Sequence, residues 1–290
     1  MFTGAMTALV TPFRDGAIDH RALADLVEAQ IAGGIHGLVP CGSTGEAATL
    51  THEEHVEIVR AVVRLAHGRV PVIAGTGSNA TAEAIRLTRG AEEAGADGAL
   101  LISPYYNKPT QEGIYRHYVA VAEATRLPLI LYNIPGRTAS TIAPETIARL
   151  ARVKNIVGVK EATGSLAHVL ETIEAAGPDF AVYAGDDILA LPIMAVGGKG
   201  VIAVGANLVP RQFAELATTV LAGDLEGGRL LMYRLLPLVR AMSLEVNPLP
   251  VKTALALMGK CAEEFRLPLT PMSPTNRARL ETVLREYHLV

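Results

Sequence analysis

Residues 129–160 read LILYN-IPGRTASTIA-PETIARLARVKN-IVGVK, and they contain one complete repeat of the pattern that decides the fold. Two short apolar runs, Leu129–Asn133 and Ile156–Lys160, flank an amphipathic stretch over Pro144–Leu150. Apolar runs of this length bounded by Asn, Pro or Gly indicate buried strands, and the spacing between them is helical. The stretch therefore predicts a strand–helix–strand unit with parallel strands.

The same alternation recurs along most of the chain. Apolar runs, often rich in Val, Ile and Leu, begin about every 30 residues, which is the length of one strand–helix unit. Such runs indicate strands that are covered on both faces, as in parallel sheets. The eight expected strands are Ala5–Val10, His36–Pro40, Val70–Ala74, Gly98–Ser103, Leu129–Asn133, Ile156–Lys160, Ala181–Ala184 and Gly200–Val204.

Amphipathic stretches between these runs predict helices. Asp19, Thr51 and Thr81 are candidate N-caps, and Glu54 follows Thr51 at capping-box spacing. Eight strands alternating with helices predict a (β/α)₈ TIM barrel, and a doubly wound open sheet is less favoured because no dinucleotide-binding fingerprint is present. Examples of the expected helices are Arg21–Ala32, His52–Ala66, Ala80–Ala94, Glu112–Ala124, Pro144–Leu150 and Ser165–Ala175.

The last part of the chain has no strand pattern. After Val220 the sequence predicts helices over Leu225–Leu244, Val251–Gly259 and Pro274–Tyr287, separated by Pro-rich turns. We therefore expect a catalytic barrel over residues 1–224 and a helical appendage over residues 225–290.

Composition narrows the classes of function. The 290 residues carry a net charge of −3 and no cluster of Lys or Arg, which disfavours nucleic acid and anionic membranes as partners. Only two cysteines, Cys41 and Cys261, are present, so a disulfide scaffold is not expected. The N-terminus lacks the features of a leader, and no apolar run reaches about 18 residues. These features predict a soluble cytoplasmic protein.

Barrel enzymes carry their chemistry at the C-terminal ends of the strands, and one lysine falls there. Of six lysines, Lys160 alone ends an expected strand, whereas Lys154 and Lys199 precede strands and Lys108 lies in a loop. Because Lys160 follows a dry apolar run, burial would lower its pKa and leave a neutral amine that attacks ketones. The alternative is a structural lysine paired with a carboxylate such as Glu161.

Hydroxyl groups gather at the same expected end of the barrel. Tyr132, Tyr106, Ser43 and Thr44 are candidates for moving protons onto and off a carbinolamine and an enamine, although each tyrosine alone could be a packing ring. Arg137, on a loop at this end, has the planar fork that suits a substrate carboxylate, with a solvated surface arginine as the alternative.

Three other features have weaker implications. His52-Glu-Glu-His55 lacks the zincin spacing, because Val56 stands where the second histidine would be, so no metal site is expected. Gly42-Ser-Thr-Gly45 is similar to an anion-binding nest but lacks the ending of a nucleotide-binding P-loop. Cys41 has no histidine on a neighbouring strand end and is a poor candidate nucleophile.

Four motifs in order carry a resemblance to a known family. The chain resembles the dihydrodipicolinate synthase (4-hydroxy-tetrahydrodipicolinate synthase) family over its whole length. The broader pyruvate-dependent class I aldolases share the lysine and the Gly-x-x-Gly-Glu loop, while the Ile-Pro-Gly-Arg segment and the Tyr-Tyr-Asn loop indicate the synthase. The motifs are Gly42-Ser-Thr-Gly-Glu46, Tyr105-Tyr-Asn-Lys-Pro109, Tyr132-Asn-Ile-Pro-Gly-Arg-Thr138 and Gly158-Val-Lys-Glu-Ala-Thr-Gly164, with Asn247-Pro-Leu-Pro-Val-Lys252 in the appendage.

The resemblance implies a reaction and roles for individual residues. Pyruvate would form an imine with Lys160, and its enamine would attack L-aspartate 4-semialdehyde on the diaminopimelate route to lysine, with no cofactor. Tyr132, Ser43 and Tyr106 would form a proton relay, with Tyr106 reaching a neighbouring subunit of a homotetramer built from dimers. The implied substrate contacts are Arg137 for the semialdehyde carboxylate, Thr44, Ser43 and Ile202 for pyruvate, and Gly185 at the end of the seventh strand.

The resemblance also implies feedback inhibition. Family members inhibited by L-lysine bind it at a dimer interface, and the matching positions offer a carboxylate, an amide, imidazoles and an aromatic ring. A plain helix face is the alternative for these positions. They are Ala48, His52, His55, Asn79, Glu83 and Tyr105.

Two departures and two rival functions accompany the resemblance. Cys41 lies where a small apolar residue is common. Ser43 stands where the family usually has threonine, which keeps the hydroxyl but constrains its rotamer less. Another aldolase of the family, cleaving N-acetylneuraminate or a keto-deoxy sugar acid, is the nearest rival, and Arg137 argues against it. A non-catalytic ligand-binding barrel would have no use for Lys160 and the tyrosines.

Overall fold

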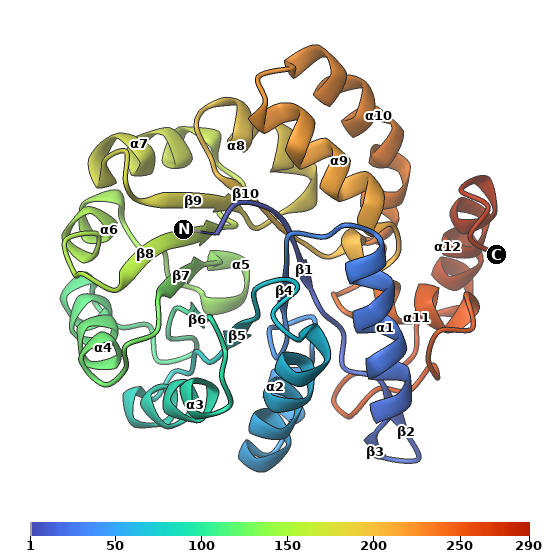
Figure 1. Ribbon diagram of the computed structural model, residues 1–290, viewed down its shortest axis with the longest axis horizontal. Coiled ribbons are helices and arrows are strands. Elements are labelled where there is room, and N and C mark those ends of the chain that lie inside the picture. Colours follow the sequence, from blue (N-terminus) through green and yellow to red (C-terminus); the bar gives the residue numbers. More distant parts are fainter. Residues whose placement is uncertain (1) are drawn as a thin grey trace.

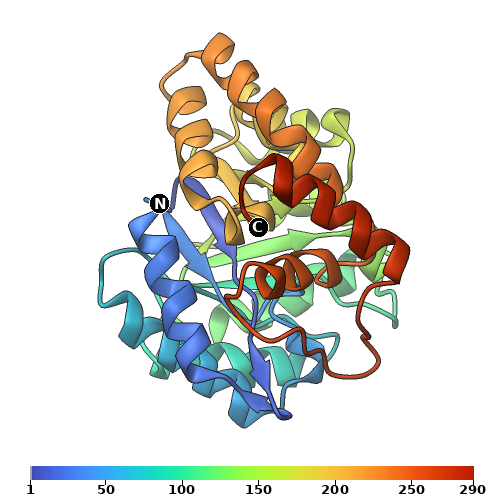
Figure 2. The same cartoon turned by 90° about the vertical axis from the view of Figure 1, so that its right-hand side faces the viewer.

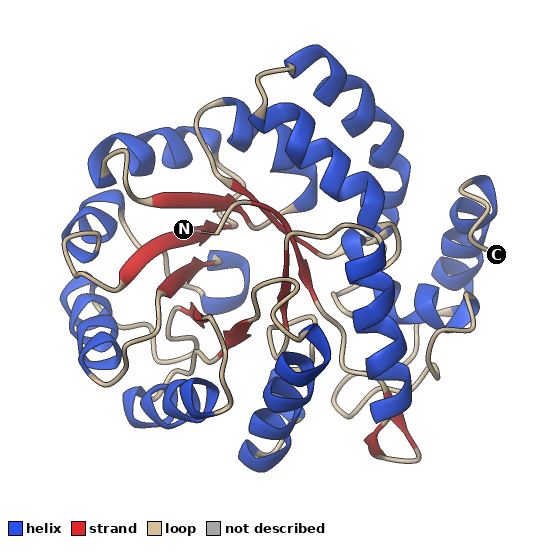
Figure 3. Ribbon diagram, viewed as in Figure 1, coloured by secondary structure: helices blue, strands red, loops and turns tan. Residues whose placement is uncertain are grey.

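Eight short parallel strands form a barrel at the centre of the molecule, and helices surround it (Figures 1 and 3). The computed structural model describes residues 2–290. From β5 to β10 each strand pairs with the next one along the chain, β10 pairs with β1, and β1 pairs with β4. The (β/α)₈ prediction is therefore confirmed. The strands are β1 (Gly4–Ala8), β4 (Gly37–Val39), β5 (Ile73–Gly75), β6 (Gly98–Ile102), β7 (Leu129–Asn133), β8 (Ile156–Glu161), β9 (Ala181–Ala184) and β10 (Gly200–Ala203).

Two contacts close the barrel. An isolated parallel bridge between Leu38 and Val72 joins β4 to β5. On the other side of β4, β1 lies between β4 and β10, and Gly4 is in register with Gly200. Gly200 has a φ of 155°, and a Cβ added there would lie 2.0 Å from the carbonyl oxygen of Gly4, so only glycine fits at this point of the β1–β10 pairing.

The strands are buried on both faces, as expected of parallel strands. One set of side chains fills the barrel interior, and the opposite set packs against the helices. This packing leaves each strand end fixed in position, which is what a site at the strand ends requires. The interior residues are Met6, Ala8, Val39, Ile73, Leu100, Ile130, Tyr132, Ala181, Tyr183 and Ile202.

The surrounding helices agree with the six expected ones to within one residue at each end. Asp19 caps the first of them, and Thr51 forms a capping box with Glu54. Helices α8 and α9 follow β9 and β10, as the (β/α)₈ prediction requires, and the hairpin of β2 (Phe13–Arg14) with β3 (Ala17–Ile18) adds to the expected pattern. The barrel helices are α1 (His20–Ala32), α2 (His52–Ala66), α3 (Thr81–Glu93), α4 (Gln111–Glu123), α6 (Pro144–Leu150), α7 (Leu166–Ala176), α8 (Ala190–Ala195) and α9 (Pro210–Leu221), with short turns α5 (Pro135–Thr138), η1 (Ala47–Thr49), η2 (Asp187–Leu189) and η3 (Gly205–Asn207).

The expected cap at Thr81 is wrong. Ala80 occupies the N-cap position of α3 and makes no side-chain cap bond. The Ala80 N–H is satisfied by the Ser78 hydroxyl at 3.1 Å, and the Thr81 hydroxyl lies 2.9 Å from His117 Nδ1 instead. Helix α3 therefore begins without a side-chain cap.

Three helices follow the barrel: α10 (Leu225–Ala241), α11 (Leu249–Leu257) and α12 (Pro274–Glu286). Figure 2 brings α11 and α12 to the front, where they lie beside the barrel. Lys252 of α11 is fully buried and bonds Glu46 of the barrel. The division of the chain into a barrel up to residue 224 and an appendage from residue 225 stays a prediction. The Lys252–Glu46 contact joins the two predicted parts. Within residues 2–290, every helix is too short or too polar to span a lipid bilayer.

Candidate active site

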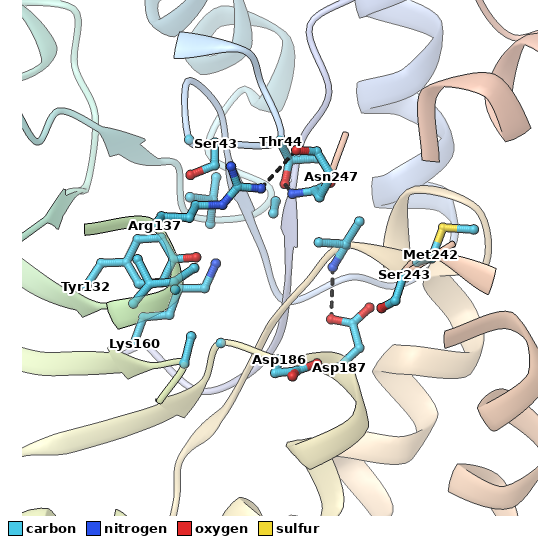
Figure 4. A pocket seen from close by; sticks show the side chains of 18 of the residues that line it. Ser43, Thr44, Tyr132, Arg137, Lys160, Asp186, Asp187, Met242, Ser243 and Asn247 are labelled. Atoms are coloured by element: carbon cyan, nitrogen blue, oxygen red, sulfur yellow. Dashed lines mark hydrogen bonds between the residues drawn. The ribbon is translucent and has the colours of Figure 1, made fainter. Parts of the chain in front are cut away.

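A cavity of about 680 Å³ opens where the barrel strands end. Figure 4 shows Lys160, Tyr132 and Arg137 on one side of it, Ser43 and Thr44 above, and Asp187 opposite. Residues from seven of the eight barrel strands or the loops that follow them, and from α10 and the following turn, border the cavity, so segments far apart in the sequence meet here. Six of the predicted site residues are among them, namely Ser43, Thr44, Tyr132, Arg137, Lys160 and Gly185.

Lys160 occupies the second-last position of β8, in register with Tyr132 on β7 and Tyr183 on β9. The residue is only 5% exposed, and its Nζ lies 4.3 Å from the centroid of the Tyr132 ring. Burial lowers the pKa of Lys160 from 10.5 to about 8, partly offset by the negative charge of Asp187. A substantial neutral fraction is thus present near neutral pH, and neutral amines add to ketones.

Glu161 is not the partner of Lys160. Successive side chains of a strand point to opposite faces, so Glu161 leaves the barrel wall on the outer side. There its carboxyl group lies 3.2 Å from His168 and 3.4 Å from the Thr163 hydroxyl. Burial raises the pKa of Glu161 to about 8. The structural alternative for Lys160, a Lys160–Glu161 pair, therefore does not describe this site.

Asp187 is the buried acid that faces the lysine, and the sequence reading missed it. Its two carboxyl oxygens accept from the N–H groups of Val204 at 3.0 Å and Gly205 at 2.7 Å. Burial raises the pKa of Asp187 to about 6, although these hydrogen bonds oppose the rise. A signal was available, because Gly185-Asp-Asp187 ends the seventh expected strand, but nothing distinguished an acid that points into the cavity.

The loop that follows β4 carries Ser43 and Thr44 in a forced conformation. Cys41 and Glu46 both have positive φ values, 57° and 55°. A Cβ at Gly75 would lie 2.3 Å from the Cys41 carbonyl oxygen, so the loop packs directly on the neighbouring strand end. Thr44 is 3% exposed, and its hydroxyl accepts from Asn247 Nδ2 at 3.0 Å. Asn247 is a second residue that sequence reasoning did not place in the site.

Arg137 and Tyr132 complete the wall on the β7 side. Arg137 lies on the short turn α5, and its guanidinium donates to the carbonyl oxygen of Asn247 at 2.9 Å. Burial raises the pKa of Tyr132 well above its usual value, with the Arg137 charge opposing the rise. Tyr132 thus keeps its proton at neutral pH, beside a cation able to hold a carboxylate.

Two predicted site residues do not border the cavity. Ile202 is fully buried in the barrel interior. Tyr106 is 89% exposed, and its φ of 71° with a 2.9 Å bond from Asn107 N to Tyr105 O describes a tight, strained γ-turn. The turn holds an aromatic side chain away from its own chain's cavity.

A second cavity of about 590 Å³ lies between the loop that follows β4 and helices α2 and α3. It is bordered by Ala48, His52, His55, Glu83 and Tyr105 of the expected lysine site, but not by Asn79, whose backbone oxygen accepts from Asn107 instead. His52 lies 2.7 Å from Glu83, and His55 Nε2 lies 2.7 Å from the Gly75 carbonyl oxygen. The two cavities share the walls formed by Gly42, Ser43, Leu100, Tyr132, Arg137 and Asn247.

The surroundings of His52, His55 and Cys41 do not suit a metal site or a reactive thiol. Within residues 2–290, three or more His, Cys, Asp or Glu residues nowhere gather as a metal site would require. Cys41 is 2% exposed, and burial raises the pKa of its thiol, which disfavours the thiolate.

Comparison with known proteins points to one family. The chain matches the Dihydrodipicolinate synthetase family over residues 1–287. A 4-hydroxy-tetrahydrodipicolinate synthase of Geobacter sulfurreducens is 55% identical over 290 residues, which is 100% of both chains. The chloride-inhibited dihydrodipicolinate synthase of Acinetobacter baumannii complexed with pyruvate is 44% identical, with a TM-score of 0.98 and 100% of both chains covered. The DHDPS of Cyanidioschyzon merolae with lysine bound is 38% identical, with a TM-score of 0.96, covering 100% of this chain and 99% of that chain.

The lowered pKa of Lys160 predicts the pH dependence of imine formation. As pH rises through about 8, the neutral fraction of the amine increases and then levels off, so borohydride trapping of a small keto acid should accelerate and reach a plateau. The measurement is the initial rate of mass gain on the peptide containing Lys160, with Lys160→Arg as the control that gains no mass. A midpoint near 10.5, the value of an ordinary lysine, would contradict the desolvated site.

Proposed function

The chain belongs to the dihydrodipicolinate synthetase family, and we propose that it condenses pyruvate with L-aspartate 4-semialdehyde to give 4-hydroxy-tetrahydrodipicolinate. The observation that carries this function is the Lys160 amine, held with a pKa of about 8 in a cavity that also presents hydroxyl groups and a guanidinium. The reaction belongs to the diaminopimelate route to lysine, and each of its steps needs one of these groups.

The first half of the reaction takes place on pyruvate. Lys160 Nζ adds to the keto carbon, and the carbinolamine loses water to give an imine. Loss of a methyl proton then gives the enamine, a carbon nucleophile made without a metal. The enamine carbon attacks the aldehyde of the semialdehyde, forming the new carbon–carbon bond and an alkoxide that takes up a proton.

The second half releases the product. The amino group from the semialdehyde attacks the imine carbon, and the Lys160 amine departs as the ring closes. The sum is one pyruvate and one semialdehyde converted to one cyclic product and one water. Lys160 is regenerated as a free amine, and its lowered pKa suits both addition and departure.

Proton transfer falls to the hydroxyl groups. Tyr132 holds its proton because burial raises its pKa. It can donate that proton to the carbinolamine oxygen as water leaves, take up the proton released when the enamine forms, and donate it again to the alkoxide. Ser43 borders both this cavity and the one beside it, a position suited to passing protons onward. We assign Tyr132, Ser43 and the Tyr106 of a neighbouring subunit to this relay.

Substrate carboxylates have separate partners. The buried Thr44 hydroxyl and the loop N–H groups near it suit the pyruvate carboxylate. Arg137, on the cavity wall, suits the carboxylate of the semialdehyde. Gly185 follows β9 and lets it pack closely on the end of β8, because an added Cβ would lie 2.9 Å from the Glu161 carbonyl oxygen. Ile202 supports the pyruvate end from within the barrel.

The reaction predicts a specific loss when Arg137 is changed. Arg137→Met should raise the KM for aspartate semialdehyde by about 10- to 100-fold, because a charge-assisted bidentate contact is lost, while borohydride trapping of pyruvate at Lys160 continues. The assay is consumption of the semialdehyde in the presence of pyruvate. Cleavage of N-acetylneuraminate or a keto-deoxy sugar acid by the unaltered protein, with no semialdehyde consumed, would favour the rival aldolase function.

Tyr106 supports an oligomer in which subunits complete each other's sites. Tyr106 is 89% exposed on a strained turn, and a second subunit that covered it would bring its hydroxyl into a cavity. We therefore propose a homotetramer built from dimers.

The two cysteines are free, and we place the enzyme in the cytoplasm.

Mixing two inactive variants tests this arrangement. Lys160→Arg and Tyr106→Phe chains, denatured and refolded together in equal amounts, should regain about a quarter of wild-type activity, because half of the dimers are mixed and each has one intact site. Each variant refolded alone is the control. Activity that does not rise above that of the separate variants would show that Tyr106 acts in its own chain or not at all.

We also propose that L-lysine binds in the second cavity and inhibits the enzyme. Glu83 and His52 can hold an ammonium group, and the wall shared with the first cavity gives the ligand contact with Ser43, Tyr132 and Arg137. The solved structure with lysine bound supports this proposal for the family.

Lysine inhibition predicts a selective loss on changing Glu83. Millimolar L-lysine should inhibit the wild-type enzyme, and Glu83→Gln should raise the inhibitory concentration at least about tenfold because a charged contact with the ligand is removed. L-norleucine, which lacks the side-chain ammonium, is the control ligand. An inhibition curve that stays flat in the wild type would remove the proposal.

A further inference from the structure

We propose that Glu46 and Lys252 form a positioning pair that holds the Ser43–Thr44 loop in its pyruvate-binding shape. The inference rests on the proposed function, because it assigns these residues an effect on pyruvate capture. Neither side chain borders the first cavity, so both would act through the loop. The pair also links α11, in the helical segment after the barrel, to the end of β4.

The pair is an ion pair without access to water. Lys252 Nζ lies 2.5 Å from Glu46 Oε1, and both side chains are 0% exposed. The Nζ also lies 4.1 Å from the centroid of the Phe13 ring and 5.3 Å from that of Phe265. Glu46 Oε2 accepts from the backbone N–H of Arg266 at 3.3 Å. The ammonium thus faces the carboxylate and two aromatic rings, and the carboxylate faces the ammonium and one backbone N–H group.

Such a pair contributes geometry more than stability. Removing two charges from water costs free energy that their attraction offsets only when contact is close, and apolar replacements of both partners often fold as well. Stability alone therefore does not account for a 2.5 Å contact between residues 206 positions apart in the sequence. A buried ion pair can also fix the relative positions of the two segments that carry it. The question is which atoms lose their positions when the pair is absent.

The loop answers it, because Glu46 stands at its end in a left-handed conformation. Glu46 has φ 55° and ψ 35°, which a residue with a Cβ adopts only under restraint. Two residues earlier, Thr44 is held by Asn247 Nδ2. Thr44 and Glu46 are thus each held by one residue of the segment 247–252.

The segment that supplies both contacts is itself tied to the site. The carbonyl oxygen of Asn247 accepts from Arg137. A shift of α11 would therefore move Asn247 away from Thr44 and Arg137, and a shift of the loop would move the Thr44 hydroxyl from the pyruvate carboxylate. The ion pair prevents both shifts at once, which is the function we assign to it.

Three variants test the pair. E46L/K252M removes both charges and leaves no unpaired one, and Glu46→Asp keeps the charge but shortens the side chain by one methylene group. Glu54→Gln is the matched control, because Glu54 bonds the Arg266 guanidinium at 2.6 Å and so also ties the barrel to residues after α11, yet it lies on α2 and not on the loop. For each we would measure Tm, kcat, the KM for pyruvate, and the pyruvate concentration that gives half-maximal borohydride trapping at Lys160.

We expect the pyruvate values to separate from folding. E46L/K252M should fold and need about tenfold more pyruvate for half-maximal trapping, and Glu46→Asp about threefold more, because the contact with the pyruvate carboxylate weakens. The pH midpoint of trapping should stay as in the wild type, since the surroundings of Lys160 are unchanged. Glu54→Gln should lower Tm at most and leave the pyruvate values within about twofold.

Each result decides the matter. Wild-type pyruvate values in a folded E46L/K252M would overturn the inference, whatever the change in Tm. If that variant does not fold, Glu46→Asp decides, and unchanged pyruvate values there would overturn it equally. Failure of the wild-type protein to trap pyruvate would instead refute the proposed function, so the two failures are distinguishable.

Discussion

Desolvation of a single amine is the constraint on which the rest of the site depends. The pKa of Lys160 falls from 10.5 to about 8 because the barrel wall excludes water, a change of roughly 3 kcal/mol against the charged form at 1.36 kcal/mol per pKa unit. Asp187 opposes the fall, since a negative charge favours the ammonium. With burial and the Asp187 charge opposing each other, both forms of the Lys160 amine are populated near neutral pH. The neutral form is the one that reacts with a ketone.

The barrel supplies this environment through its register. Lys160 and Tyr132 are partners on neighbouring strands, so the distance between amine and ring follows from sheet geometry and requires no loop. Residues on loops, by contrast, depend on contacts from distant segments. Thr44 relies on Asn247 and Glu46 on Lys252, both from the chain beyond the barrel. The site thus has one rigid side built by strands and one side built by tertiary contacts.

This division explains what the sequence predicted. The recurring apolar runs located all eight strands, and with them Lys160, Tyr132 and Gly185, because an apolar run bounded by turn residues is a local property of the sequence. The sequence could not show that Lys252 is buried against Glu46, or that Asp187 faces the lysine, because these depend on pairs far apart along the chain. The Thr81 cap failed for a different reason, because α3 begins at Thr81 itself and Ala80 takes the N-cap position, and sequence patterns do not locate a helix end to a single residue.

The pairing of β1 with β10 has a consequence for synthesis on the ribosome. Gly4 cannot meet Gly200 until nearly 200 further residues have been made, which at about 5–20 residues per second takes roughly 10 to 40 s. During that interval β1 has an apolar strand edge with no partner, and such an edge pairs readily with other chains. The unfinished chain is therefore more exposed than the finished barrel to pairing with other newly made chains.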